Sequence, residues 1–276
     1  MSYLGRKMRE DLRLSGKAPK TEIAYLREVR RLKNYYGKLP DLITEDEIRK
    51  YFLYLMYDLN VSDSLLGQAV CGIKFFYTVT LNREWRTLQY IRIKKKKKLP
   101  VILSKEEVRE ILEKIVNLKH QFILSVIYSG GLRIGEACRL KIQDVDSKRM
   151  LIKINLGKGK KDRYTILGAQ TLRLMKEYLK TFQPKEWLFP GQPKSKHISA
   201  RAVELVFHKA CNLAGIRKKV TVHSLRHSFA THLMENGTNF RLIQAILGHS
   251  RPSTTLIYTH VCKYHIEELT SPIDSI

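Results

Sequence analysis

The sequence predicts a mainly α-helical protein of two domains, with a small antiparallel β-hairpin or sheet in the second domain. Apolar residues recur at helical spacing along most of the chain. Strand-like alternation is confined to 151–156 and 163–167. A run of lysines at 94–98 separates the two patterned blocks. These three observations indicate two helical domains joined by a charged connection.

The lysine run is the expected domain boundary. Its five like charges repel one another, and Pro100, which follows Leu99, lacks an amide hydrogen and resists helix formation. A nuclear-localisation signal is the alternative interpretation, but a position between two patterned blocks favours an extended linker. We therefore predict domains at 1–93 and 101–276, with a basic linker at 94–100.

Three long helices and one short helix are expected in the N-terminal domain. The first spans 21–36, and its apolar stripe is formed by Ile23, Leu26, Val29 and Leu32. A capping-box pattern at Thr44 and Glu47 opens the second helix. Its inward residues are Ile48, Phe52, Leu55 and Leu59. The third helix spans 62–80, and the short fourth lies near 85–91.

The second domain is expected to be mostly helical as well. Ser104 and Glu107 form another capping box, and an apolar helix at 121–129 ends at two glycines. A short helix at 133–140 precedes the two strands, which flank a glycine-rich turn at 157–162. The remaining helices are predicted at 169–182, 199–214, 223–235 and 240–247.

The charge of the chain argues for a polyanionic partner. Of its 276 residues, 51 are Lys or Arg and 26 are Asp or Glu, which gives a net charge of +25. Such an excess favours nucleic acid over a merely soluble basic protein or one that sits on anionic membranes. No apolar run is long enough to span a membrane, and the first residues lack the apolar core of a secretory signal.

The cysteines indicate a reducing compartment. They are widely scattered and form no CxxC pair: Cys71, Cys138, Cys211 and Cys262. This pattern fits free thiols in a cytoplasm rather than a disulfide framework or a zinc site. We therefore expect a cytoplasmic protein.

The helix that opens at His223 carries a cluster of polar residues. Arg226 and His227 lie three and four residues further on, so all three side chains share one face. For His227, an orienting or core position beside the site is favoured over direct chemistry. His232 lies about 180° around the helix and is expected to be structural or solvent-facing.

Other segments supply further polar residues next to glycines. Arg133 follows a glycine turn, and Lys158 occupies the expected hairpin tip between two glycines. Gly248 ends the helix before His249, and Tyr258 follows nine residues later. Taken alone, Tyr258 fits a core tyrosine better than a catalytic one.

Together these residue types suit the transfer of a phosphodiester. Attack on phosphorus adds negative charge to the non-bridging oxygens, and arginine forks match those oxygens and stay charged. Histidines can donate to the same oxygens or move a proton, and a tyrosine can form a covalent phosphotyrosine. A lysine can protonate the leaving oxygen. No carboxylate cluster is evident that would hold magnesium, so no metal and no cofactor are expected.

Four segments of the chain resemble the active-site segments of the tyrosine recombinase (phage integrase) family. They are SGGLRIGEACRL, LGKGKKDR, HSLRHSFATHLMENG and LGHSRPSTTLIYTH, in the order and at the spacing usual in that family. The resemblance covers about 100–265, and the HxLRH, LGH and tyrosine combination is specific. The N-terminal helices are similar to the family's SAM-like core-binding domain, although this match is weaker.

The resemblance implies that Arg133 and Arg226 clamp the scissile phosphate. It also implies that Lys158 is the general acid for the leaving 5′-oxygen. Lys160 and Lys161 are alternatives in the same hairpin, but Lys158 has the Gly-Lys-Gly register.

Four further roles follow from the same resemblance. His223 assists acid–base chemistry near the nucleophile, and His249 donates to a phosphate oxygen. Tyr258 is the nucleophile and forms a 3′-phosphotyrosyl link. Glu136 supports the first arginine segment. The resemblance thus implies a site-specific DNA recombinase that needs neither metal nor ATP.

The short chain resembles two-domain, Xer-like members of the family. Such a resemblance implies double-stranded DNA with a specific site as substrate and a homo-tetramer on paired DNA, or a hetero-tetramer with a paralogue. Residues 265–269 are a candidate for the short C-terminal helix that relatives dock into a neighbouring subunit, with a self-packed end as the alternative. The linker residues expected on the DNA backbone are Lys94, Lys95, Lys96, Lys97 and Lys98.

Two other functions are compatible with similar residues. A type IB topoisomerase would relax DNA without exchanging partners, but the short N-terminal block and compact catalytic region favour recombination. A non-catalytic DNA-binding relative would keep the fold alone, and the filled catalytic positions argue against it.

Overall fold

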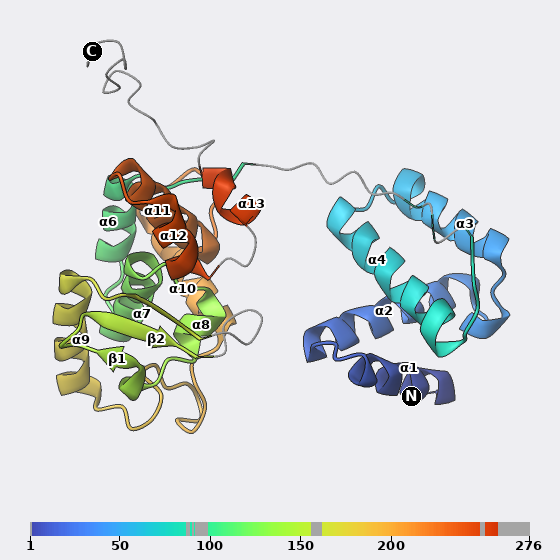
Figure 1. Cartoon of the computed structure of the whole chain (residues 1–276), viewed down its shortest axis with the longest axis horizontal. Helices are drawn as coiled ribbons and strands as arrows, with labels where there is room; N and C mark the ends of the chain where they lie inside the picture. Colours follow the sequence, from blue (N-terminus) through green and yellow to red (C-terminus); the bar gives the residue numbers. More distant parts are fainter. Residues whose placement is uncertain are drawn as a thin grey trace, which may run out of the picture. The chain divides into compact units, whose positions relative to one another are not determined.

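The computed structural model describes residues 2–86, 89, 91, 99–155, 162–248 and 252–258. The chain divides into two compact units, Met1–Lys97 and Lys98–Ile276. Each unit encloses its own hydrophobic core. Figure 1 shows the helices of the first unit in blue to cyan and those of the second in green to red.

Helices make up the described part of the first unit. They are α1 (Tyr3–Leu14), α2 (Pro19–Tyr36), α3 (Glu45–Leu53) and α4 (Asp63–Phe75), with a short 3-10 turn at Pro40–Leu42. The π-helical turns Tyr54–Asp58 and Phe76–Thr80 extend α3 and α4. The capping box predicted at Thr44 and Glu47 is confirmed, with each side chain bonded to the other's backbone N–H.

Helix α1 was not predicted, and its presence explains an error in the expected core. Ile23 is 65% exposed, whereas its neighbour Glu22 is buried. The Glu22 carboxylate pairs with Arg9 at 2.7 Å and Arg13 at 3.2 Å, both from α1. Because α1 covers this side of α2, the buried face is turned toward Glu22 and away from Ile23.

Two other expectations for this unit need correction. Leu59 was expected inside but is 52% exposed, because it lies just beyond the π-helical turn that ends at Asp58. The predicted short helix near 85–91 falls partly outside the described residues. Within it, Trp85 is not helical and stacks on Tyr77, with ring centroids 3.8 Å apart.

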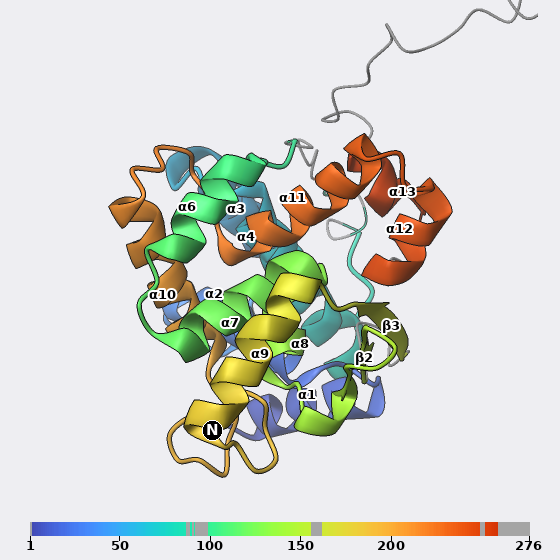
Figure 2. The ribbon, with the colours of Figure 1, turned by 90° about the vertical axis from the view of Figure 1, so that its left-hand side faces the viewer.

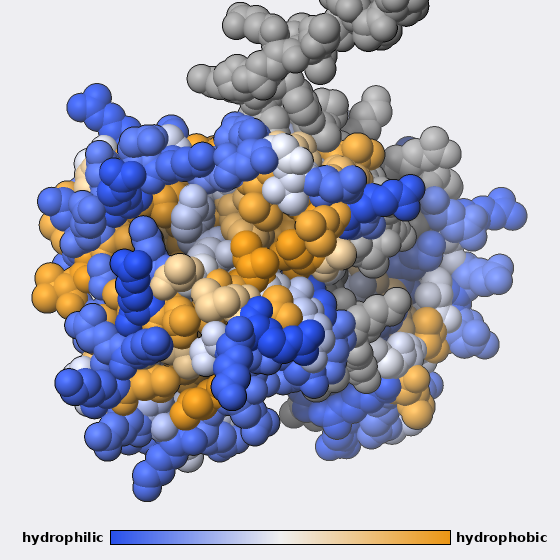
Figure 3. All heavy atoms as spheres, turned by 60° about the vertical axis from the view of Figure 1, so that its left-hand side comes forward, coloured by the Kyte–Doolittle hydropathy of each residue, from blue (hydrophilic) through white to orange (hydrophobic). Residues whose placement is uncertain are grey.

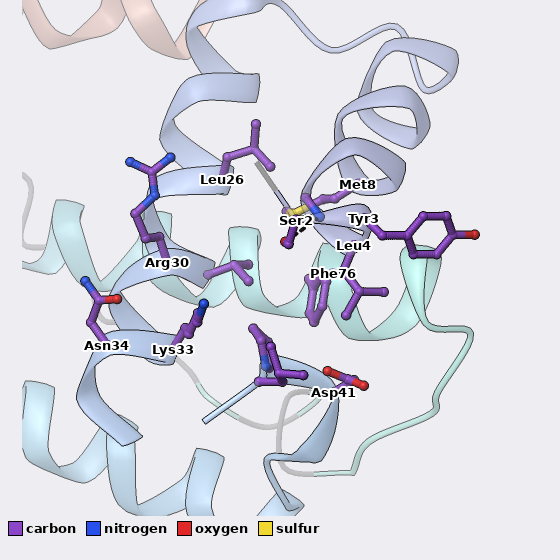
Figure 4. Close-up of a pocket in the computed structure, with 14 residues that line it drawn as sticks. Ser2, Tyr3, Leu4, Met8, Leu26, Arg30, Lys33, Asn34, Asp41 and Phe76 are labelled. Carbon is purple, nitrogen blue, oxygen red and sulfur yellow. Dashed lines mark hydrogen bonds between the residues drawn. The ribbon is translucent and has the colours of Figure 1, made fainter. Parts of the chain in front are cut away.

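The first unit also carries a groove of about 670 Å³ between α1, α2 and the ends of the neighbouring turns. Met8 and Phe76 belong to its apolar lining. In Figure 4, Arg30 and Lys33 lie along one side on α2, and Tyr3 lies on α1 at the other.

The second unit is built around a helix whose middle residues are buried. Its elements are α6 (Lys105–Glu113), α7 (Leu118–Ser129), α8 (Ile134–Cys138), α9 (Ala169–Phe182), α10 (Ala200–Leu213), α11 (Val222–Glu235), α12 (Phe240–Leu247) and α13 (Pro252–Thr255). Helix α7 buries consecutive residues from Phe122 to Ile127, as expected for a helix that is apolar all round. Figure 2 shows α9 lying along it, and α11 also packs on α7.

A small antiparallel sheet completes the second unit. Its order is β1 (Val145–Asp146), β2 (Leu151–Ile154) and β3 (Arg163–Ile166), so one short strand joins the predicted hairpin. Ile152 pairs with Thr165, and Ile154 pairs with Arg163. Strand β3 packs against α12, which brings the hairpin beside the C-terminal helices (Figure 2). No helix in the described part of the chain is long and apolar enough to cross a membrane.

Candidate active site

The turn after α7 packs directly against α11. Gly131 has a φ of +60°, and a Cβ there would lie 2.3 Å from Phe229 of α11. Only glycine therefore allows this close approach. The Gly131 carbonyl consequently accepts a hydrogen bond from Nη1 of Arg226, which also belongs to α11.

Arg133 caps the next helix and is held by Glu136. The Glu136 carboxylate accepts from the Arg133 backbone N–H at 2.8 Å and from its Nη1 at 2.7 Å. The Arg133 side chain remains 24% exposed, whereas that of Glu136 is buried. Glu136 thus fixes the direction of an arginine that can still be approached from outside.

Arg163, a second arginine that binds the Glu136 carboxylate, was not predicted from the sequence. Arg163 of β3 donates to both oxygens of Glu136, at 2.9 and 2.7 Å, and its Nε donates to the Ile246 carbonyl at 2.7 Å. Arg163 therefore ties the hairpin to α8 and to the end of α12. The strand alternation could have revealed it, because Arg163 shares the inward face with Thr165 and a buried arginine needs an acidic partner.

The arginines control the ionisation of Glu136. Burial by itself raises the pKa of this carboxyl, but the hydrogen bonds and charges of Arg163 and Arg133 lower it to about 2. Glu136 is therefore a carboxylate at neutral pH.

Arg226 is the most deeply buried arginine of the site. Its exposure is 1%, its Nη2 donates to the Leu247 carbonyl at 2.6 Å, and its Nη1 lies 3.9 Å from Glu136. Burial and the charge of Arg133 lower the pKa of Arg226 to about 9, which leaves it charged at neutral pH. Arg226 therefore joins α11, the glycine turn and α12 around a fixed positive charge.

Tyr258 lies in the same cluster. It ends the 3-10 turn Leu256–Tyr258, is 1% exposed, and packs with Phe229, Ile243 and Leu247. Its hydroxyl lies 3.1 Å from Nδ1 of His227. Burial raises the pKa of Tyr258, and the charges of Arg226 and Arg133 oppose this shift. The phenolic oxygen is thus protonated at neutral pH. It is also close enough to both arginines to interact electrostatically with them.

Two histidines of α11 line this cluster. His223 packs edge-on against His227, with ring centroids 4.5 Å apart. Desolvation of the ring and the charges of Arg226 and Arg133 lower the pKa of His223, although the residue as a whole is exposed. Burial, His223 and Arg226 lower the pKa of His227 to about 4. Both rings are therefore neutral at physiological pH.

The structure thus brings together Arg133, Glu136, His223, Arg226 and Tyr258 from the predicted site. The predicted Lys158 and His249 lie outside the described residues, as do the alternatives Lys160 and Lys161 and the linker lysines Lys94, Lys95, Lys96, Lys97 and Lys98. Strands β2 and β3, which lie on either side of residues 156–161, are described, and so is Gly248 just before His249, with a φ of +62°.

His232 of the same helix is part of the core. It is buried, and its Nδ1 lies 2.9 Å from the Tyr128 hydroxyl of α7. Among the residues that the structure describes, no group of three or more His, Cys, Asp or Glu side chains could hold a metal ion.

We expect acid to destabilise the second unit in two stages. His227 titrates at about 4 when folded and at 6.5 as a free side chain, so the stability it contributes is lost as pH falls through that interval. Glu136 falls to about 2 from 4.5, so its contribution is lost at still lower pH. Urea denaturation at a series of pH values measures this. A free energy of unfolding that stayed constant from neutral pH to about 4 would contradict the expectation.

Comparison with known proteins establishes the family. The phage integrase family model matches residues 80–265, and the model for the phage integrase N-terminal SAM-like domain matches residues 4–87. The chain belongs to the phage integrase family. It is therefore a tyrosine recombinase, as its motifs predicted.

Individual relatives match over almost the whole chain. An integrase/recombinase of Sinorhizobium fredii is 39% identical over 275 residues, covering 99% of this chain and 89% of the relative. The tyrosine recombinase XerA of Thermococcus onnurineus is 37% identical over 263 residues, covering 93% and 90%. These matches confirm the predicted Xer-like character.

One solved structure confirms the fold. The XerH site-specific recombinase, in a post-cleavage complex with its palindromic difH substrate, superimposes with a TM-score of 0.70 at 22% identity. The match covers 98% of this chain and 95% of that one. The mainly helical architecture with a SAM-like N-terminal domain is thereby confirmed.

Proposed function

We propose that this tyrosine recombinase cleaves and rejoins double-stranded DNA at a specific site through a covalent 3′-phosphotyrosyl intermediate. The observation that carries the proposal is the position of the Tyr258 hydroxyl, which lies beside His227 and within the field of Arg133 and Arg226. A nucleophile, a proton acceptor and two fixed cations are the parts that phosphodiester transfer requires. The DNA complex of the XerH relative supports the choice of substrate.

The proposed roles distribute charge and protons around one phosphate. Arg133 and Arg226 stabilise the charge that develops on the non-bridging oxygens during attack by Tyr258. Lys158 protonates the leaving 5′-oxygen, and His249 donates to a phosphate oxygen. Because phosphotyrosine conserves the energy of the phosphodiester, a 5′-hydroxyl can reseal the strand without ATP.

Two further residues complete the proposal. His223 assists acid–base chemistry at the edge of the cluster. Glu136 supports both Arg133 and Arg163 and so holds the arginine segment in place.

The proposed assembly follows the family. Residues 1–93 would form the core-DNA-binding domain and 101–276 the catalytic domain, with the basic linker 94–100 along the DNA backbone. Strand exchange needs paired duplexes, so we propose a homo-tetramer on DNA or a hetero-tetramer with a paralogue. Reaction with DNA, and the free thiols of Cys71, Cys138 and Cys211, make the cytoplasm the proposed compartment.

The test is covalent trapping on nicked DNA. A library of duplexes with randomised sequence and a nick traps the intermediate, because the short released strand diffuses away and cannot reseal the break. Denatured adducts are then isolated, and their DNA is sequenced to obtain the site. No adduct with the wild-type protein would overturn the enzymatic function and favour a non-catalytic DNA-binding relative.

A plasmid assay separates recombination from topoisomerase activity. A plasmid that carries two copies of the recovered site should be resolved or inverted by site-specific exchange. Relaxation of supercoils without any exchange would instead identify a type IB topoisomerase.

DNA binding should weaken steeply as salt rises. Each neutralised phosphate releases counterions, so the logarithm of the binding constant should fall with the logarithm of salt concentration by about 0.9 per contact. The face in Figure 3 carries many hydrophilic side chains around apolar patches, and the chain's net charge of +25 is suited to phosphate contacts. Fluorescence anisotropy with a labelled duplex measures the slope.

A variant without the linker lysines provides a comparison for the salt dependence of DNA binding. Replacing Lys94, Lys95, Lys96, Lys97 and Lys98 by glutamine should reduce it by up to about 0.9 for each phosphate contact that is lost. A flat salt response of the wild type would contradict the phosphate-clamp proposal.

A further inference from the structure

The hydroxyl of Tyr258 contacts a histidine to which the family resemblance gave no catalytic role. Nδ1 of His227 lies 3.1 Å from Tyr258 Oη, and the two ring centroids are 5.6 Å apart. His223, the histidine to which the resemblance assigns acid–base assistance, packs edge-on against His227. His227 therefore contacts both His223 and the reacting oxygen.

We propose that His227 accepts the proton of the Tyr258 hydroxyl as this oxygen attacks the scissile phosphorus, and returns it during rejoining. The inference rests on the proposed function and deepens it, because it assigns the proton transfer to His227 instead of His223. His227 is then a catalytic residue, since it touches the reacting oxygen.

Every atom is accounted for in this step. A lone pair of Tyr258 Oη forms the bond to phosphorus while the hydroxyl proton moves to Nδ1 of His227. The bond from phosphorus to the 5′-oxygen breaks, and that oxygen takes a proton from the general acid. In rejoining, the 5′-hydroxyl attacks phosphorus and gives its proton back to the deprotonated general acid. The bond from phosphorus to Tyr258 breaks, and the imidazolium returns its proton to Oη.

The surroundings of His227 keep its ring neutral before the reaction, so that one ring nitrogen can accept a proton. Burial, His223 and Arg226 hold its pKa low enough that the ring is neutral before the reaction. A neutral imidazole has one N–H and one acceptor nitrogen, so Nδ1 accepts from the phenol when Nε2 carries the hydrogen. A bound phosphodiester would add negative charge beside these cations and thereby raise the basicity of the ring.

The charged groups near the rings of His223, His227 and Tyr258 come from two helices. Arg226 belongs to α11 itself, and Arg133 and Glu136 belong to α8 and its cap. His223 precedes His227 by one helical turn, so the two rings lie on the same face of α11 and pack edge-on. This arrangement places the imidazole of His227 against Tyr258 and leaves His223 nearer to solvent.

The helix supplies a matched control for the experiment. His232 also belongs to α11, is buried, and contacts a tyrosine hydroxyl, that of Tyr128, at 2.9 Å. His232→Asn therefore removes a buried histidine that contacts a tyrosine but lies outside the proposed site. It should cleave DNA at the wild-type rate.

The test measures single-turnover cleavage on the nicked duplex recovered by trapping from the random library. His227→Ala removes the imidazole, whereas His227→Asn keeps a polar group near Nδ1 that cannot take up a proton. Both should slow formation of the covalent adduct by about 100-fold or more, the usual effect of losing a general base. Melting temperature and DNA affinity are measured on each variant to establish that it is folded and binds.

Added imidazole distinguishes a proton acceptor from a residue that only packs, because loss of packing would not be restored by free imidazole. It should restore cleavage by folded His227→Ala in proportion to its unprotonated fraction. Failure to restore cleavage would count against the proposal.

Two results would overturn the assignment. The first is wild-type cleavage by His227→Asn, since hydrogen bonding alone would then suffice. The second is loss of cleavage in His223→Asn but not in His227→Asn, which would identify His223 as the base. If the wild type itself formed no adduct, the proposed function would fail instead, so the two failures are distinguishable.

Discussion

Tyr258→Phe should form no covalent DNA adduct and should still bind its DNA site. The substitution removes one oxygen and leaves the ring in its contacts with Phe229, Ile243 and Leu247. The fold should therefore persist, with the lost hydrogen bond to His227 costing only about 1 kcal/mol. Removal of a nucleophile abolishes a covalent route entirely, so adduct formation should fall by at least about a thousand-fold.

Tyr128→Phe is the matched control for this variant. It removes the hydroxyl of another largely buried tyrosine that contacts a histidine of α11. Its adduct formation should match the wild type on the nicked duplex. Adducts that persist in Tyr258→Phe would show that another residue attacks the phosphate. Loss of DNA affinity in Tyr258→Phe would show that the change had disturbed the fold.

Glu136→Gln should cause the largest loss of stability in the site. The carboxylate accepts bonds from Arg133 and from both arms of Arg163, and Arg226 lies 3.9 Å away. A glutamine removes the negative charge and turns an N–H₂ group toward arginine donors. Breaking a buried ion pair leaves uncompensated charge, so the free energy of unfolding should fall by about 3–5 kcal/mol.

A carboxylate outside the site provides the comparison. Glu186→Gln removes a partner of Lys141, at 2.8 Å, but both side chains are exposed. Exposed pairs contribute little, so this variant should unfold almost as the wild type does. Urea denaturation compares the two variants. If Glu136→Gln cost no more than Glu186→Gln, the buried arginine network would not be what holds α8, β3 and α12 together.

Local sequence determined much of the helical framework. The helices predicted at 169–182 and 240–247 are present with those bounds, and the capping box at Ser104 and Glu107 is confirmed. Such features depend on residues within one or two turns of each other, and their physical causes are therefore visible in a short stretch of sequence. In the predicted stripe of α2, Val29 and Leu32 are buried, but the inward position expected for Ile23 was wrong. The burial of this first turn depends on α1, a neighbouring helix that the pattern did not reveal.

The motifs determined to which family the chain belongs, and they predict which residues serve the chemistry. Their contacts were decided only by the tertiary structure. His227 and Tyr258 are 31 positions apart, and Arg163 and Glu136 are 27 apart. Packing of α11, α12 and β3 brings these pairs together. Such contacts between distant residues cannot be predicted from the local periodicity of the sequence. The sequence therefore predicts Tyr258 as the nucleophile, whereas the fold determined that His227 is the histidine that contacts its hydroxyl.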